Sequence, residues 1–165
     1  MKFKLSICKI LVLATGFIFP TAVRAMETGL IDPQKISEVW INPGLYSFHF
    51  QRDKGLNANN YGLGFDYRYS TTSSITLGEF KNSDRQASRY LGWYWEPVSI
   101  GAARLGAVLG AIDGYPKMRD GGWFAAVIPS ISFEHDKFGA NILVIPSYQN
   151  RLYGAISIQL KYKIH

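Results

Sequence analysis

The sequence feature that most constrains the fold is a strict alternation of apolar and polar residues, which recurs in short segments along the chain. In the last segment, every second residue is apolar: Ile156, Ile158, Leu160, Tyr162 and Ile164. The intervening residues Ser157, Gln159, Lys161 and Lys163 are polar. A period of two residues is typical of a β-strand that has one apolar face and one polar face.

Turn signals divide the chain into eight segments that are predicted to be strands. They are residues 44–52, 60–70, 73–81, 87–97, 103–112, 122–134, 137–146 and 151–165. Eight is an even number, and the lengths cluster near the roughly 9–11 residues that a tilted membrane-spanning strand needs. We therefore expect an all-β fold, an eight-stranded antiparallel transmembrane β-barrel. A short helix is also expected after Asp32-Pro33, because proline suits the first helical position.

A soluble secreted barrel would show the same alternation with its two faces exchanged, and the aromatic residues favour the membrane alternative. Tyr61 and Tyr69 lie on one face of a predicted strand. At ~3.3 Å per residue and the usual strand tilt, they are separated by roughly 20 Å along the barrel axis. That separation is close to the ~25 Å apolar band between the aromatic girdles of outer-membrane barrels.

The two ends of the chain differ in character. Residues 1–25 are predicted to be a signal peptide, because a basic start and an apolar stretch precede the small-residue cleavage site Val23-Arg24-Ala25. Residues 26–165 are then one barrel domain in the outer membrane of a Gram-negative bacterium. The only cysteine, Cys8, is lost with the signal peptide, which excludes a disulfide scaffold.

The composition of the remaining chain narrows the function. Without the four cations of the signal peptide, 14 Lys and Arg face 12 Asp and Glu, so the charge gives no reason to expect a nucleic-acid partner. The three histidines lack the spacing of a metal site, and no glycine-rich phosphate loop follows a strand. We therefore expect neither a metal nor a cofactor.

A histidine and a serine are predicted to meet at one rim of the barrel. If the last strand ends on the periplasmic side, His49 and Ser83 both lie at the outer rim, about 10 Å apart by strand spacing. A neighbouring imidazole can take the proton of a serine hydroxyl and activate it as a nucleophile. Asn82 and Asp84 are candidates for a third group that orients the imidazole. The alternative is that these are an ordinary lumen histidine and an ordinary turn serine.

The segment Phe80–Glu96, FKNSDRQASRYLGWYWE, resembles the corresponding segment of outer-membrane lipid A palmitoyltransferases. Six residues match without a gap: Phe80, Lys81, Ser83, Gly92, Trp95 and Glu96. Outside this segment, the matching positions are His49 near the end of the first strand, Arg119-Asp120 before Trp123, and the strand prolines Pro129 and Pro146. The resemblance covers roughly residues 44–165.

This resemblance implies a monomeric outer-membrane acyltransferase. It implies that an acyl chain moves from a membrane phospholipid to a hydroxyl of lipid A in lipopolysaccharide, with His49 as the general base. Ser83 would be the nucleophile or an oxyanion-positioning hydroxyl. Asn82, which replaces the aspartate of the family, would be a positioning group. Gly92, Arg119, Pro129 and Pro146 would contact the substrates, and the prolines would mark gaps that admit lipid from the side.

Two departures from the family pattern lead to specific expectations. The family has a glycine on its fourth strand that sets the depth of the lumen pocket, and Tyr94 stands at that position here. A phenol ring there predicts a donor chain shorter than palmitate. Restoring the family carboxylate with Asn82→Asp is expected to raise activity.

Two other functions stay open at the level of the sequence. A lipid A deacylase or phospholipase would use the same serine and histidine with water as the acceptor. A non-catalytic structural barrel in the outer membrane would need neither residue, and the amide of Asn82 favours that reading.

Overall fold

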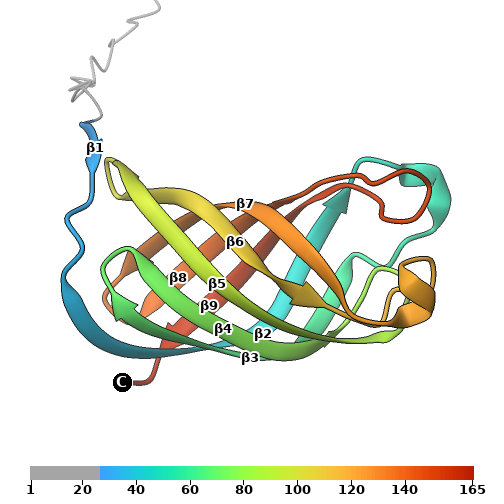
Figure 1. Ribbon diagram of the computed structural model, residues 1–165, viewed down its shortest axis with the longest axis horizontal. Coiled ribbons are helices and arrows are strands. Elements are labelled where there is room, and N and C mark those ends of the chain that lie inside the picture. Colours follow the sequence, from blue (N-terminus) through green and yellow to red (C-terminus); the bar gives the residue numbers. More distant parts are fainter. Residues whose placement is uncertain (1–26) are drawn as a thin grey trace, which may run out of the picture.

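The computed structural model describes residues 27–165, so the predicted signal peptide lies outside the described residues. Eight of its strands form one antiparallel sheet in which each strand pairs with the next, and β9 pairs with β2 to close a barrel (Figure 1). The prediction of an all-β, eight-stranded antiparallel barrel is confirmed. The strands are β2 (Lys35–His49), β3 (Asn59–Ser70), β4 (Ser73–Lys81), β5 (Ala87–Ile100), β6 (Ala103–Ile112), β7 (Phe124–His135), β8 (Phe138–Ile145) and β9 (Ala155–Lys163).

The two ends of the barrel are built differently. Tight turns join β3 to β4, β5 to β6 and β7 to β8 at one end, where the C-terminus also lies (Figure 1). We call this the turn end. Four longer connections lie at the opposite end, which we call the loop end: residues 50–58, 82–86, 113–123 and 146–154. Two of them contain short 3₁₀ turns, η1 (Arg52–Lys54) and η2 (Arg119–Gly121).

The predicted short helix after Asp32-Pro33 is wrong. Between residues 27 and 165 there is no α-helix, and hence none that is long and apolar enough to cross a membrane. A short strand, β1 (Thr28–Leu30), pairs instead with Val98–Ile100 of β5. This part of β5 extends past Ser73, the residue at which β4 begins. From Lys35 onward the chain belongs to β2 and pairs with β3, so the ladder hydrogen bonds outweigh the local helix-start signal.

The first barrel strand is longer than the segment 44–52 that the sequence predicts. It begins at Lys35 and continues through Pro43-Gly44, which resembles a turn in the sequence. In the structure this dipeptide forms a bulge: the register against β3 shifts between Asn42 and Gly44, and Gly44 has a φ of 98°. Pairing with β9 is also interrupted between Ile41 and Tyr46, so the proline costs no ladder hydrogen bond there.

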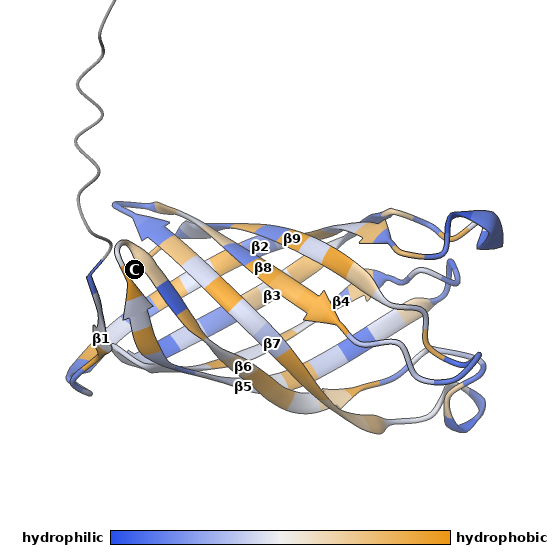
Figure 2. Cartoon of the chain, turned by 90° about the horizontal axis from the view of Figure 1, so that it is seen from above, coloured by the Kyte–Doolittle hydropathy of each residue, from blue (hydrophilic) through white to orange (hydrophobic). Residues whose placement is uncertain are grey.

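The strands place polar side chains inside and apolar side chains outside. In β9, Ser157 and Gln159 are 1% and 3% exposed, whereas Ile156 and Leu160 are 40% and 63% exposed. Figure 2 shows hydrophobic and hydrophilic residues alternating along the strands, while the tips of the long loops are hydrophilic. The outer face therefore carries many exposed aromatic and aliphatic side chains, including Tyr61, Leu63, Phe65, Tyr67, Tyr69, Trp93, Trp95 and Leu160.

Charged side chains fill the interior near the turn end. The Glu134 carboxylate accepts hydrogen bonds from Arg68, from Arg104 at 2.7 and 2.8 Å, and from Lys161 at 2.6 Å. Beside this charged cluster, Glu96 accepts hydrogen bonds from Ser130 and Ser132 at 2.8 and 2.6 Å. The interior nearer the loop end contains a cavity.

The wall is incompletely paired between β7 and β8. Their ladder runs from His135↔Phe138 to Ser130↔Leu143 and ends there. Beyond that point β7 pairs only with β6, from Pro129 to Phe124, and β8 pairs only with β9. Pro129 lacks the amide that a continued ladder needs on β7. The half of the wall nearer the loop end therefore has a gap in its hydrogen bonds between these two strands.

Candidate active site

His49 and Ser83 form a hydrogen bond at the loop end, with 2.8 Å between His49 Nε2 and Ser83 Oγ. His49 is the last residue of β2, and Ser83 lies in the turn between β4 and β5. One strand, β3, lies between β2 and β4 in the sheet, and the hydrogen bond joins the two side chains across it. This geometry lets the imidazole take the serine proton. Within residues 27–165, Ser83 is the one side chain that hydrogen-bonds His49.

Asn82, next to Ser83, is fully buried and holds the turn together. Its side-chain oxygen, Oδ1, accepts hydrogen bonds from the backbone amides of Asp84 and Gln86, each at 2.9 Å. Its amide nitrogen donates to Ser88 Oγ at 2.9 Å and to the carbonyl of Gly114 at 2.8 Å. Asn82 therefore connects the Ser83 turn to the loop 113–123, and it positions His49 only indirectly.

The same turn is fastened to the first loop. The Asn57 amide donates to the carbonyl of Ser83 at 2.9 Å, and its side chain donates to the carbonyl of Asn82 at 3.2 Å. Arg85, with a φ of 63°, donates through its guanidinium to the carbonyl of Gly55 at 2.9 Å. Three loops are thus joined around Ser83, which restrains the backbone that carries its hydroxyl.

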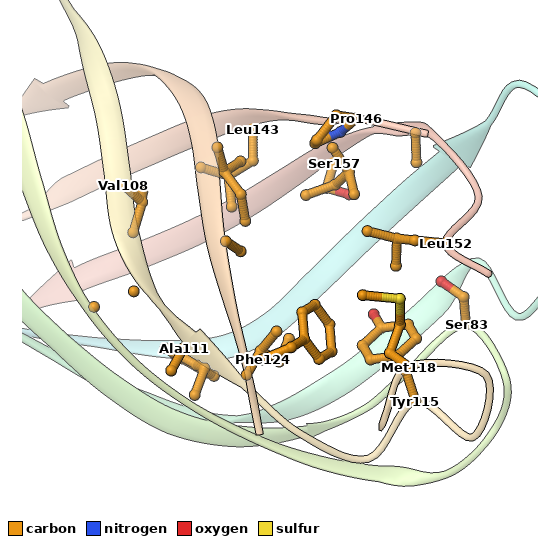
Figure 3. A pocket seen from close by; sticks show the side chains of 18 of the residues that line it. Ser83, Val108, Ala111, Tyr115, Met118, Phe124, Leu143, Pro146, Leu152 and Ser157 are labelled. Carbon is orange, nitrogen blue, oxygen red and sulfur yellow. The ribbon is translucent and has the colours of Figure 1, made fainter. Parts of the chain in front are cut away.

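A cavity of about 480 Å³ opens inside the barrel beside Ser83. Its wall is mainly apolar and includes Val108, Ala111, Phe124 and Leu143, which Figure 3 shows together with Ser83 at the same cavity. The volume lies within the 300–1,000 Å³ that is usual for small-molecule sites. A hydroxyl paired with an imidazole therefore lies next to a space suited to an apolar group.

Tyr94 and Gly92 line this cavity further along β5. Tyr94 is 4% exposed, and its hydroxyl accepts a hydrogen bond from Asn141 Nδ2 at 3.2 Å. A Cβ atom at Gly92 would come within 2.9 Å of Val108 Cγ1, so a side chain there would take up cavity space. Both residues thus line the cavity, and their contact with a substrate stays a prediction.

The other predicted substrate-binding residues are more dispersed. Arg119 and Pro146 line the cavity from the connections 113–123 and 146–154 at the loop end. Pro129 is exposed on the outer face at the point where pairing between β7 and β8 ends. Asp84, the second candidate for orienting His49, lines the cavity but makes no side-chain hydrogen bond to the imidazole among the described residues.

The structure adds a residue that the sequence did not single out. Tyr115, in the loop 113–123, lines the cavity beside Ser83, and its ring packs edge-on against Phe124 with 6.0 Å between centroids (Figure 3). Burial raises the pKa of the Tyr115 phenol, and the nearby Asp84 carboxylate raises it further. Nothing in the sequence distinguishes this tyrosine from an ordinary loop residue, because Asp113-Gly114-Tyr115-Pro116 resembles a turn.

The start of that loop is anchored to β5 by a charged pair. The Asp113 carboxylate accepts hydrogen bonds from the Arg89 backbone at 2.6 Å and from its guanidinium at 2.9 and 2.6 Å. Burial by itself would raise the pKa of Asp113, but these hydrogen bonds outweigh it and hold the pKa below its usual value. Within residues 27–165, no group of three His, Cys, Asp or Glu side chains is arranged to hold a metal ion.

No protein-family model matches the chain, and no curated protein matches it at a significant level. The class of protein is therefore defined by its own geometry, an eight-stranded barrel in which a serine that is hydrogen-bonded to a histidine lines an internal apolar cavity.

Proposed function

We propose that this protein is an outer-membrane acyltransferase that moves an acyl chain from a phospholipid to a hydroxyl of lipid A. The observation that carries the proposal is the hydrogen bond between His49 and Ser83, together with the apolar cavity inside the barrel that Ser83 lines. The resemblance of Phe80–Glu96 to lipid A palmitoyltransferases points to the same chemistry.

The faces of the barrel support a location in a membrane. The outward side chains are largely aromatic and aliphatic, which would be costly in water over so large a surface but suits a lipid environment. The buried side chains are mostly polar and hydrogen-bonded to one another. This arrangement favours the membrane barrel over the soluble secreted barrel.

The proposed reaction needs one base and one attacking hydroxyl. His49 takes the proton of that hydroxyl while a new C–O bond forms at the acyl carbon of the phospholipid. The ester C–O bond to glycerol then breaks, and His49 returns the proton to the glycerol oxygen. The attacking hydroxyl is that of Ser83 in a two-step transfer, or that of lipid A in a direct transfer that Ser83 assists. In the two-step transfer, a lipid A hydroxyl then attacks the acyl-serine ester and gives its proton to His49, which returns it to Ser83 Oγ as the C–O bond to Ser83 breaks. In both cases the products are a lysophospholipid and an acylated lipid A.

The lipids are proposed to enter from the side rather than through the polar loops. Val127 and Ile128 of β7 line the cavity, and so do Ile145 and Pro146 at the end of β8. The gap in pairing between these strands thus lies against the cavity wall. Arg119, an exposed cation of the third loop, suits the phosphate groups of lipid A.

The test measures acyl transfer by the purified barrel in detergent, with a defined phospholipid as donor and lipid A as acceptor. Mass spectrometry is expected to show a gained acyl mass on lipid A. His49→Ala and Ser83→Ala should each abolish this gain, and the double variant should be no worse than either, because residues that act as a unit are not additive. His135→Ala is the matched control, since His135 is exposed at the turn end.

Each alternative result of this assay would support a different function. A lost acyl mass on lipid A, or release of a free fatty acid from the phospholipid, would show a deacylase or phospholipase that uses water as acceptor. No change in either lipid, with His49→Ala behaving like the unaltered protein, would favour the non-catalytic barrel.

A further inference from the structure

Acyl transfer also needs a hydrogen-bond donor for the carbonyl oxygen, because this oxygen becomes negatively charged as the attacking hydroxyl adds. Four of the backbone amides in the Ser83 turn are already occupied. Those of Asp84 and Gln86 donate to the Asn82 side chain, while those of Asn82 and Arg85 donate to carbonyls within the turn at 2.8 and 3.0 Å. These four amides are used to fold the turn and are not free to bind a substrate.

Tyr115 offers a donor at the required place. Its phenol and the Ser83 hydroxyl belong to the same cavity wall, and Figure 3 shows the two side chains at the same end of the cavity. The Ser83 side chain lowers the pKa of the phenol somewhat, against the larger effect of burial, which agrees with its place beside Tyr115 in the cavity wall. Since the Tyr115 ring packs against Phe124, its hydroxyl is the polar part of an otherwise apolar stretch of wall.

The backbone next to Tyr115 is held by hydrogen bonds to two other segments. Its neighbour Gly114 accepts the hydrogen bond from Asn82, and the Gly114 amide donates to the carbonyl of Gly121 at 2.8 Å. Gly114 has a φ of 83°, and a Cβ atom there would lie 2.1 Å from the carbonyl oxygen of Ala87. Only glycine permits this close approach, which brings the Tyr115 loop against the turn that carries Ser83.

We infer that Tyr115 is a further catalytic residue, whose phenol donates a hydrogen bond to the acyl carbonyl oxygen while the hydroxyl adds to the acyl carbon. The phenol keeps its proton throughout, and His49 alone carries out the proton transfer. This inference rests on the proposed acyl transfer. Because burial raises the pKa of Tyr115, the phenol stays protonated and able to donate at neutral pH.

The first test replaces Tyr115 by phenylalanine, which keeps the ring and its packing on Phe124. Loss of one oxyanion donor should lower kcat about 10²–10³-fold, with KM little changed. Tyr153→Phe is the matched control, because it removes another phenol hydroxyl from the cavity wall. That hydroxyl accepts a hydrogen bond from Lys117 at 3.1 Å. The folded fraction of each variant is measured by its heat-modifiable mobility in gels, and activity is expressed per folded molecule.

A second pair of variants separates donation from shape. 4-Aminophenylalanine at position 115 retains a donor, while 4-methylphenylalanine has a similar shape and no donor. The amino variant should be at least ten times as active per folded molecule as the methyl variant. Equal activity of the two, or full kcat in Tyr115→Phe, would overturn the role of Tyr115 and leave the proposed function intact. A barrel without any acyl transfer, even with Tyr115 present, would overturn the proposed function and this inference with it.

Discussion

At the scale of single residues, the side chain of Asn82 shows why an amide and a carboxylate are not interchangeable beside Ser83. The side chain is fully buried, donates two hydrogen bonds and accepts two. A carboxylate can accept the same two hydrogen bonds but cannot donate to Ser88 or to the Gly114 carbonyl. The structure therefore argues against the sequence-based expectation that Asn82→Asp restores a better site.

We now predict that Asn82→Asp lowers both stability and acyl transfer. The substitution would place a carboxylate oxygen against the carbonyl oxygen of Gly114, and a buried polar group that loses its partner costs about 1–3 kcal/mol. The free energy of unfolding, measured by urea titration, checks the first effect, and the kcat of acyl transfer checks the second. Asn150→Asp, at an exposed loop position, is the control and should change neither. Higher activity in Asn82→Asp would instead support the family aspartate as an orienting group.

At the scale of strands, the sequence predicts the strands themselves, which follow from the alternation of apolar and polar residues. It misses features that depend on contacts between segments far apart in the chain. All eight barrel strands were predicted, because the period of two persists wherever one face is polar and the other apolar. The start of β2 was missed because Pro43-Gly44 has the composition of a turn, and only pairing with β3 shows that it is a bulge. Tyr115 was missed for the same reason, since its place beside Ser83 depends on contacts between loops.

Pro129 and Pro146 allow a test of the gap between β7 and β8. Replacing both with alanine restores two amides, one next to the last pair of the ladder and one three residues past Leu143. Each new hydrogen bond should add about 1 kcal/mol to the free energy of unfolding, while transfer from phospholipid should fall several-fold because the opening narrows. The control is Pro116→Ala, in an exposed part of the third loop. A stabilised double variant with undiminished transfer would show that lipid enters by another route.

At the scale of the whole molecule, the interior is divided into a charged half at the turn end and an apolar cavity at the loop end. Glu134 is central to the charged half, because Arg68, Arg104 and Lys161 all donate to it. The side chains of Glu134 and Lys161 are only 10% and 6% exposed, so their charges depend on each other.

Glu134→Gln should therefore destabilise the barrel strongly. It leaves three cations around a neutral amide, and the loss of one partner from a buried ion pair costs about 3–5 kcal/mol. Glu79→Gln, at an exposed position on β4, should cost little. The measurement is the urea concentration at which half of each refolded barrel is unfolded. Similar midpoints for the two variants would mean that water screens the charged cluster.

If the cavity accepts an acyl chain as proposed, the boundary between the two halves sets the length of that chain. Tyr94 lies seven residues along β5 from Ala87, which pairs with Lys81 at the loop end. At ~3.3 Å per residue and a tilt of about 40°, this is a depth of roughly 18 Å. Each C–C bond of about 1.5 Å advances an extended chain by roughly 1.3 Å, so about 14 carbons fit above Tyr94.

The barrel should therefore prefer a donor chain shorter than palmitate, and Tyr94→Gly should shift this preference toward longer chains. A longer chain meets the phenol ring, which Asn141 holds by a hydrogen bond, and overpacking a formed pocket costs about 1–3 kcal/mol. Tyr94→Phe is the matched control, because it removes that hydrogen bond but keeps the ring and should keep the preference for short chains. Mass spectrometry of lipid A, after reaction with phospholipids of mixed chain length, gives the length of the transferred chain. If the unaltered protein and Tyr94→Gly both transfer palmitate with equal preference, then Tyr94 does not form the floor of the acyl pocket, and the depth is set by the polar network around Asn141 and Gln159.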